Sequence, residues 1–196
     1  MTNIYLTLGI LSGLLIIVAD IPYALDSLKG KTKPHRITWG TICLLNIIGI
    51  ANQAASGAKG SLGLFIGMAL ATAVIFAISL FKGVGGHTKL DIACLIGAGL
   101  GLLLWYALKT PTASIIANLF VATFAMIPTL QKAYVAPGSE TRITWLIGTL
   151  AACLGILAVN SSSGILYVMP VYAALSQLAV YLILVLKKNS GSINER

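Results

Sequence analysis

The tetrapeptide RITW occurs twice, at Arg36–Trp39 (within HRITWGTICLL, from His35) and at Arg142–Trp145 (within TRITWLIGTLA, from Thr141). The two copies stand 106 positions apart in a chain of 196 residues. At the same shift, ADIP at 19–22 lies over AMIP at 125–128, with no gap between the proline and the tryptophan. An ungapped match that contains both Pro and Trp indicates an internal duplication rather than chance.

The composition is that of an integral membrane protein. Apolar residues make up 58% of the chain, charged residues 9%, and the mean hydropathy is +0.94. Soluble domains carry roughly 25% charged residues. The net charge of +8 does not predict nucleic-acid binding, because the basic residues lie in short gaps between apolar runs, as the positive-inside rule requires. We expect an integral membrane protein of a bacterial cytoplasmic membrane, in contact with the lipid bilayer.

Seven apolar runs are long enough to be membrane helices, which need about 20 mostly apolar residues each. The prediction is therefore an all-α membrane protein of seven transmembrane helices. We place these helices near 4–25, 37–55, 61–81, 90–108, 112–133, 143–160 and 164–186.

The basic residues orient the predicted helices. Of the thirteen Lys and Arg residues, only Lys59 and Lys109 fall on one side of the predicted membrane. The positive-inside rule then places the N-terminus outside and the C-terminus in the cytoplasm. The residues on the cytoplasmic side are Lys29, Lys31, Lys33, Arg36, Lys82, Lys89, Lys132, Arg142, Lys187, Lys188 and Arg196.

The parity of the helices predicts how the two copies are joined. A three-helix unit ends on the side opposite to its start, so a directly fused second copy would be inverted. Both RITW segments fall on the basic side, so one extra helix must reset the direction. We therefore predict a first three-helix bundle at 1–86, a linker helix at 87–110, a second, parallel three-helix bundle at 111–187 and a polar tail at 188–196.

This plan resembles that of the SWEET sugar transporters and the wider PQ-loop superfamily. The likeness includes a proline late in the first helix of each unit followed by a basic loop: Pro22 with LKGKTKPHR, and Pro128 with QKAYVAPGSETR. The family's Pro-Gln is replaced here by Pro22-Tyr23 and Pro128-Thr129, as expected for a distant relative. The resemblance implies transport by alternating access. It also implies a sugar-binding Asn on each unit's third helix, which the run at 61–81 lacks.

Three intramembrane residues are interpreted individually. Pro22 and Pro128 are either tolerated kinks or hinges between the bundles, and their matched positions favour hinges. Asp20 is the one acidic residue well inside a predicted span. It marks an ion or substrate pathway, or else it reaches the cytoplasmic interface and pairs with a basic residue there.

A polar stripe follows the first RITW but not the second. Trp39, Asn46 and Gln53 recur at helical spacing on one face. Asn46 either contacts a substrate or forms a hydrogen bond between helices. The same face after the second RITW is much less polar, so we expect any site to be asymmetric.

The fifth and seventh predicted helices carry further candidates for the substrate pathway, namely Asn118, Tyr172, Ser176 and Gln177. Tyr172 and Ser176 are one helical turn apart. Gln177 points about 100° away, so the three are not expected to line one narrow site.

The remaining marked residues are assigned structural roles. Arg36, Trp39, Arg142 and Trp145 are predicted to anchor their helices at the membrane interface. His35 and His87 are lone loop histidines, and we predict no metal site and no cofactor. Cys43, Cys94 and Cys153 are predicted to be reduced. Asp91 is interpreted as a helix-start residue.

Two functions agree with this pattern. The first is a transporter, either a uniporter or proton-coupled. Its solute is expected to be small and neutral or zwitterionic, because no span carries a basic residue to bind an anion. The second is a receptor or sorting protein on the same fold, whose basic loop at Lys29, Lys31 and Lys33 recognises an acidic partner or anionic lipid. No catalytic constellation predicts an enzyme. Homo-oligomerisation is left open.

Overall fold

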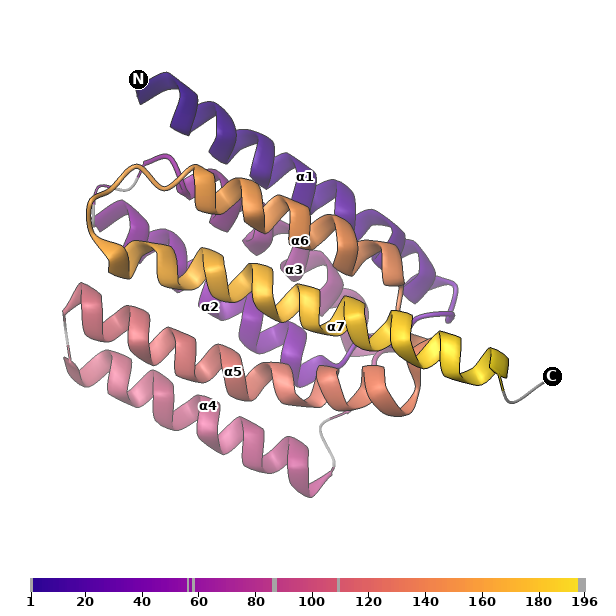
Figure 1. Cartoon of the computed structure of the whole chain (residues 1–196). Coiled ribbons are helices and arrows are strands. Elements are labelled where there is room, and N and C mark those ends of the chain that lie inside the picture. The colour runs from indigo at the N-terminus through magenta and orange to yellow at the C-terminus, as the bar shows by residue number, and fades with distance from the viewer. Residues whose placement is uncertain (1, 56, 58, 86–87, 109, 194–196) are drawn as a thin grey trace.

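The computed structural model describes residues 2–55, 57, 59–85, 88–108 and 110–193. Within these residues the chain forms seven α-helices and two 3₁₀ turns, and no strand (Figure 1). The elements are α1 (Thr2–Leu28), α2 (Arg36–Ala55), α3 (Leu62–Lys82), α4 (Lys89–Leu108), α5 (Pro111–Val135), η1 (Pro137–Ser139), α6 (Arg142–Leu157), η2 (Gly164–Tyr167) and α7 (Val168–Ile193). The all-α prediction is confirmed. α7 continues into the predicted polar tail, and 194–196 lie outside the described residues.

Five of these helices, α1, α2, α3, α5 and α7, are long and apolar enough to cross a membrane. α6 is apolar but has only 16 residues, and the side chains of α4 are described only in part. Large apolar side chains are exposed along the helices, as at Ile10, Leu14 and Val18 of α1. A soluble monomer rarely exposes so large an apolar surface, so these helices are compatible with a lipid environment.

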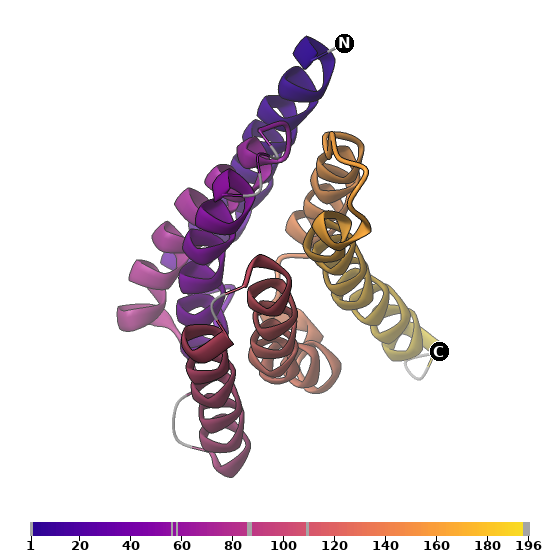
Figure 2. The same ribbon diagram turned by 90° about the vertical axis from the view of Figure 1, so that its left-hand side faces the viewer.

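The helix contacts repeat under the 106-residue shift. The first three helices correspond in order to α5, α6 and α7. α1 packs against α3, as α5 does against α7, and α2 packs against α3, as α6 does against α7. Across the molecule α1 contacts α6, and its equivalent α5 contacts α2. Figure 2 shows α4 at one edge, where it packs against α5.

Two equivalent hydrogen bonds join α1 to α6 and α5 to α2 near the RITW segments. The hydroxyl of Thr38 donates to the backbone carbonyl of Ala125 at 2.7 Å. The hydroxyl of Thr144 donates to the carbonyl of Ala19, also at 2.7 Å. Each donor stands third in an RITW segment, and the acceptors are themselves 106 positions apart. The threonine of the repeated tetrapeptide therefore connects each second helix to the other copy's first helix.

A second equivalent pair lies further from the RITW segments. Ser12 Oγ donates to the carbonyl of Ala151 at 2.7 Å. Asn118 Nδ2, at the position equivalent to Ser12, donates to the carbonyl of Leu45 at 3.4 Å. These two side chains differ chemically, yet they fill the same role. The duplication is thus preserved in the contact between helices even where the residue type differs between the two copies.

Glycines bring α1 and α3 into close contact. Gly9 and Gly13 on α1 face Gly63 and Gly67 on α3, each pair spaced by four residues. A Cβ added at Gly63 would lie 2.2 Å from the carbonyl oxygen of Gly9, and one at Gly13 would lie 2.2 Å from that of Gly63. Small residues at this spacing let two helix backbones approach closely.

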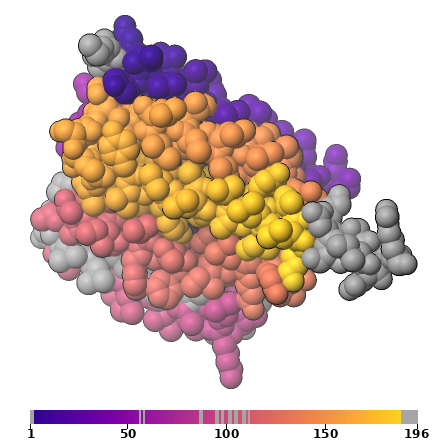
Figure 3. Space-filling model, viewed as in Figure 1, coloured from indigo at the N-terminus to yellow at the C-terminus, as the bar shows by residue number. Residues whose placement is uncertain are grey.

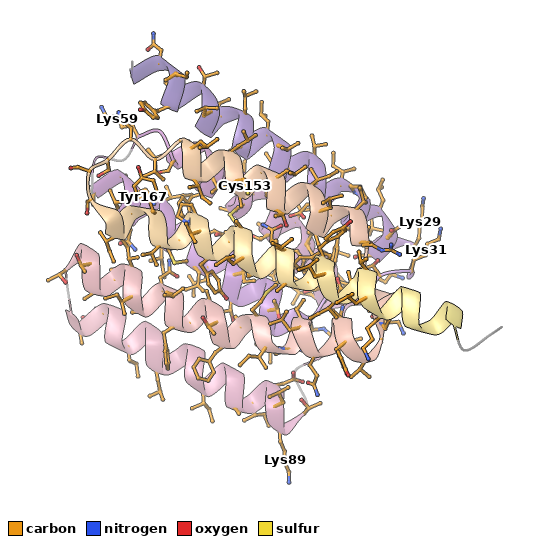
Figure 4. All side chains as sticks on the ribbon, in the orientation of Figure 1. Lys29, Lys31, Lys59, Lys89, Cys153 and Tyr167 are labelled. Atoms are coloured by element: carbon orange, nitrogen blue, oxygen red, sulfur yellow. The ribbon has the colours of Figure 1, made fainter. Side chains whose placement is uncertain are left out.

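The two ends of the helix bundle differ in charge. Lys29 and Lys31 lie at the end from which the C-terminus emerges, and Lys59 lies at the opposite end (Figure 4). The sequence assigned these lysines to opposite sides in the same way. We call the end that holds Lys29 and Lys31 the basic end. Lys109 and Arg196 lie outside the described residues.

Candidate solute cavity

A cavity of about 80 Å³ lies between the two sets of equivalent helices. Its lining comes from α1, α2, α3, α5, α6 and α7, and α4 contributes nothing to it among the described residues. α6 and α7 cover the middle of the face seen in Figure 3, between α1 and α5. The volume has room for a few water molecules or a small solute.

Most of the cavity wall is apolar, and its polar groups are few. The apolar lining includes Ile16, Phe65, Met68 and Met169. No described lining residue is basic. The polar lining residues are Asp20, Thr38, Asn46, Thr72, Thr144, Tyr172, Ser176 and Gln177, together with the indoles of Trp39 and Trp145. An apolar cavity with a few converging polar groups is the usual form of a small-molecule site.

Asp20 on α1 faces this cavity. It is 8% exposed and lies one helical turn before Tyr23. It forms no hydrogen bond or ion pair with any described residue. The structure thus shows no basic residue paired with Asp20 in the part of the chain that it describes. At the position equivalent to Asp20 stands Met126, which also lines the cavity, so the two halves contribute different side chains at this point of the lining.

Trp39 and Trp145 lie in the interior rather than at the lipid-facing surface where interfacial anchors are found. Each is 5% exposed, and their ring centroids are 6.2 Å apart. The sequence placed them correctly at the start of their helices. It did not show that the two helix starts meet between the halves, where the two indoles lie close to each other and to Tyr23.

The arginines of the two RITW segments differ from each other. Arg36 Nε donates to the carbonyl of Ser79 at 2.9 Å, and Arg36 Nη1 donates to that of Gly85 at 3.2 Å. Arg36 therefore binds the C-terminal turn of α3, where helix carbonyls lack intrahelical partners. Two of its N–H groups are therefore engaged within the protein. Arg142 is half-buried at the start of α6.

A buried polar cluster lies between the cavity and the basic end. Trp39 Nε1 donates to Tyr23 Oη at 3.2 Å, and Tyr23 Oη donates to Glu140 Oε1 at 3.4 Å. Trp145 Nε1 donates to Glu140 Oε2 at 3.0 Å. Lys132 forms an ion pair with the same carboxylate. We call Tyr23, Trp39, Lys132, Glu140 and Trp145 the basic-end cluster.

Glu140 is the centre of this cluster, and its side chain is 0% exposed. Burial raises the pKa of Glu140, while Lys132 and the donors of Trp145 and Tyr23 oppose that rise. Lys132 also donates to the backbone carbonyl of Lys33 in the α1–α2 loop. Alongside it, the hydroxyls of Thr32 and Thr141 are 2.6 Å apart. The cluster therefore ties the two equivalent loops together on the basic-end side of the cavity.

The other predicted pathway residues divide into two groups. Tyr172, Ser176 and Gln177 all line the cavity, although the three were not expected to share one narrow site. The lining therefore takes in more than one narrow face of α7. Asn46 also lines it and donates to Thr72 at 3.4 Å.

Gln53 and Asn118 do not line the cavity. Gln53 accepts a hydrogen bond from Ser61 at 3.1 Å in the region that joins α2 to α3. Asn118 forms the helix contact to Leu45 described above. The polar stripe on α2 thus includes a residue that lines the cavity, Asn46, and a residue that forms a contact within the protein, Gln53.

His35 is not a lone loop histidine. Its Nε2 lies 2.9 Å from Asp91 Oδ1, and both side chains are buried. Asp91 also accepts from the backbone N–H of Thr88 at 3.1 Å, as predicted for a helix-start residue. No cluster of three metal-ligating side chains occurs among the described residues. His87 and the side chain of Cys94 lie outside the described part, and Cys43 and Cys153 are free cysteines.

No protein-family model, curated protein or solved structure matches the chain.

Proposed function

We propose that the chain is a membrane transporter that moves a small neutral or zwitterionic solute through the central cavity. In this proposal α1–α3 and α5–α7 are two parallel three-helix bundles, and α4 links them. The N-terminus is outside and the C-terminus is in the cytoplasm, at the basic end. The protein is a distant relative of the SWEET and PQ-loop transporters, in a bacterial cytoplasmic membrane.

One observation carries the proposal: the cavity lies between two sets of helices whose contacts repeat with the sequence. Thr38 and Thr144 bind the opposite first helix in the turn that precedes Pro128 and Pro22, respectively. A proline removes one hydrogen bond of its helix, so this turn is the place where the helix bends most easily. Rocking of the two bundles about these two contacts would open the cavity alternately to either side.

Purified protein in proteoliposomes tests this function. We expect saturable flux of at least one member of a panel of small neutral and zwitterionic solutes, with and without an imposed pH gradient to separate uniport from proton coupling. Asp20→Asn is expected to change that flux, whereas Asp26→Asn, outside the cavity lining, serves as the matched control. A panel in which nothing moves, together with capture of an acidic partner that depends on Lys29, Lys31 and Lys33, would favour the receptor function instead.

A further inference from the structure

The chemistry of the cavity narrows the kind of solute that it accepts. Polar solutes such as sugars need several hydrogen-bond donors and acceptors from the protein. In this cavity most of the available donors are already committed. The question is therefore which chemical group the remaining surface is able to bind.

The threonine and indole donors of the lining are used within the protein. Thr38 and Thr144 each give their single hydroxyl proton to a backbone carbonyl. Trp39 and Trp145 direct their N–H groups into the basic-end cluster. The indoles therefore line the cavity with carbon and π surface, and they offer it no donor.

The aromatic rings form one group at this side of the cavity. The ring centroid of Tyr23 lies 5.0 Å from that of Trp39 and 6.3 Å from that of Trp145. The two indole planes are inclined by 39°, so their faces are not stacked on each other. Aromatic faces attract cations through the negative face of the ring, and tryptophan does so best.

Asp20 supplies the complementary charge. It is an acidic group, 8% exposed, which lines the cavity and has no partner among the described residues. A buried carboxylate is costly unless it is paired or takes up a proton, and the described part of the cavity wall has no basic residue to pair with it. A cationic group within the cavity would satisfy both Asp20 and the indole faces.

We propose that the cavity binds a small protonated amine, with the ammonium group held by Asp20 and by the faces of Trp39 and Trp145. This inference rests on the proposed function, because it names the class of solute that the transporter carries. It includes zwitterions that have an ammonium group and excludes sugars and carboxylates without one.

Tryptophan fluorescence provides a binding test that does not require transport. Trp105, the third tryptophan, is replaced by phenylalanine, so that emission reports Trp39 and Trp145. The detergent-solubilised protein is titrated with propylammonium chloride, and in parallel with 1-propanol, sodium propionate and sodium chloride. We expect a saturable change with propylammonium alone. Asp20→Asn is expected to weaken that binding by about tenfold or more, and Asp20→Glu by less.

Asp26→Asn is the matched control, since it removes a carboxylate on the same helix that does not line the cavity. It is expected to bind propylammonium like the unmodified chain. Equal responses to propylammonium and 1-propanol, or equal affinity in Asp20→Asn and the parent, would overturn the inference. Competition by sodium chloride at matched concentration would also overturn it, because the site would then bind inorganic cations.

The outcomes of the two experiments are separable. Flux of a neutral solute without propylammonium binding would sustain the transporter and refute the amine. Propylammonium binding without flux of any solute, the amine included, would sustain the site and refute transport.

Discussion

Among single side chains, His35 illustrates how the loops are held at the basic end. Its imidazole contacts Asp91, and Gly85 packs against its ring. Gly85 has a φ of +90°, and a Cβ there would lie 2.2 Å from His35 Nε2. The close contact and the left-handed backbone both require glycine at this position. His35 thereby links the loop before α2 to the start of α4.

His35 gives the protein a pH-dependent stability. Burial lowers its pKa below 6.5, Asp91 opposes this, and Lys132 and Arg36 lower it further. The unfolded chain then binds a proton that the folded chain does not, so stability falls as the pH drops from about 7 to about 5. We expect the melting temperature of the solubilised protein to fall over this range.

His35→Gln is expected to reduce that pH dependence, because an amide can donate to Asp91 but cannot be protonated. The measurement is the difference between the parent and the variant in melting temperature at each pH. Other groups contribute to both proteins alike, so identical slopes would show that His35 is not responsible.

The sequence contained some of the site's single residues and not others. Asp20 was visible as an isolated carboxylate in an apolar run. Thr38 and Thr144 were visible as repeated letters, but only the packing of α2 against α5 and of α1 against α6 shows what they bind. Glu140 gave no signal, because a charged residue in a basic loop is ordinary until its burial is known.

At the scale of helices, the α1–α3 contact depends on backbone approach. Gly63→Ala places a Cβ 2.2 Å from the carbonyl oxygen of Gly9, which is backbone and cannot move away alone. We expect a destabilisation of about 1–3 kcal/mol, typical of overpacking. Gly99→Ala, in α4, is the matched control, because its added Cβ meets nothing within 4 Å.

Chemical unfolding of both variants in detergent measures the effect. Gly99→Ala is expected to be neutral or stabilising by about 0.4–1 kcal/mol, since alanine restricts the unfolded chain. A Gly63→Ala protein as stable as the Gly99→Ala protein would mean that α1 and α3 separate without cost.

The helix boundaries followed from the sequence more closely than the lining of the cavity did. Apolar runs and breakers set the seven helices, because membrane helices must satisfy their own backbone hydrogen bonds. Rotation of each helix about its axis is set by its neighbours, which periodicity alone does not identify. Gln53 and Asn118, which were predicted to lie on the pathway, therefore do not line this cavity. Tyr172, Ser176 and Gln177, which were not expected to share one narrow site, all line it.

For the whole molecule, the basic-end cluster joins the two halves between the cavity and the basic end. Its bonds run between the two halves, as in the contacts of Tyr23 with Glu140 and of Lys132 with the carbonyl of Lys33. The proposed rocking motion must break them before the cavity opens toward the basic end. When these bonds are fewer or weaker, the conformation open toward the basic end is more populated, because the equilibrium follows the free-energy difference between the two states.

Glu140→Gln should therefore increase access to the cavity from the basic end. The amide keeps the shape of the side chain but loses the ion pair with Lys132 and two charge-assisted hydrogen bonds. A loss of about 1.4 kcal/mol raises the open population about tenfold. Ser176→Cys, in a background without the three native cysteines, places a reporter thiol in the cavity. Its rate of labelling by a membrane-impermeant maleimide, applied to the basic end, should rise about tenfold. Lys132→Gln should have the same effect, since it removes the same ion pair, and labelling from the opposite end should not increase.

Faster labelling from both ends would indicate general loosening of the bundle, and an unchanged rate from the basic end would mean that the cluster does not close the cavity.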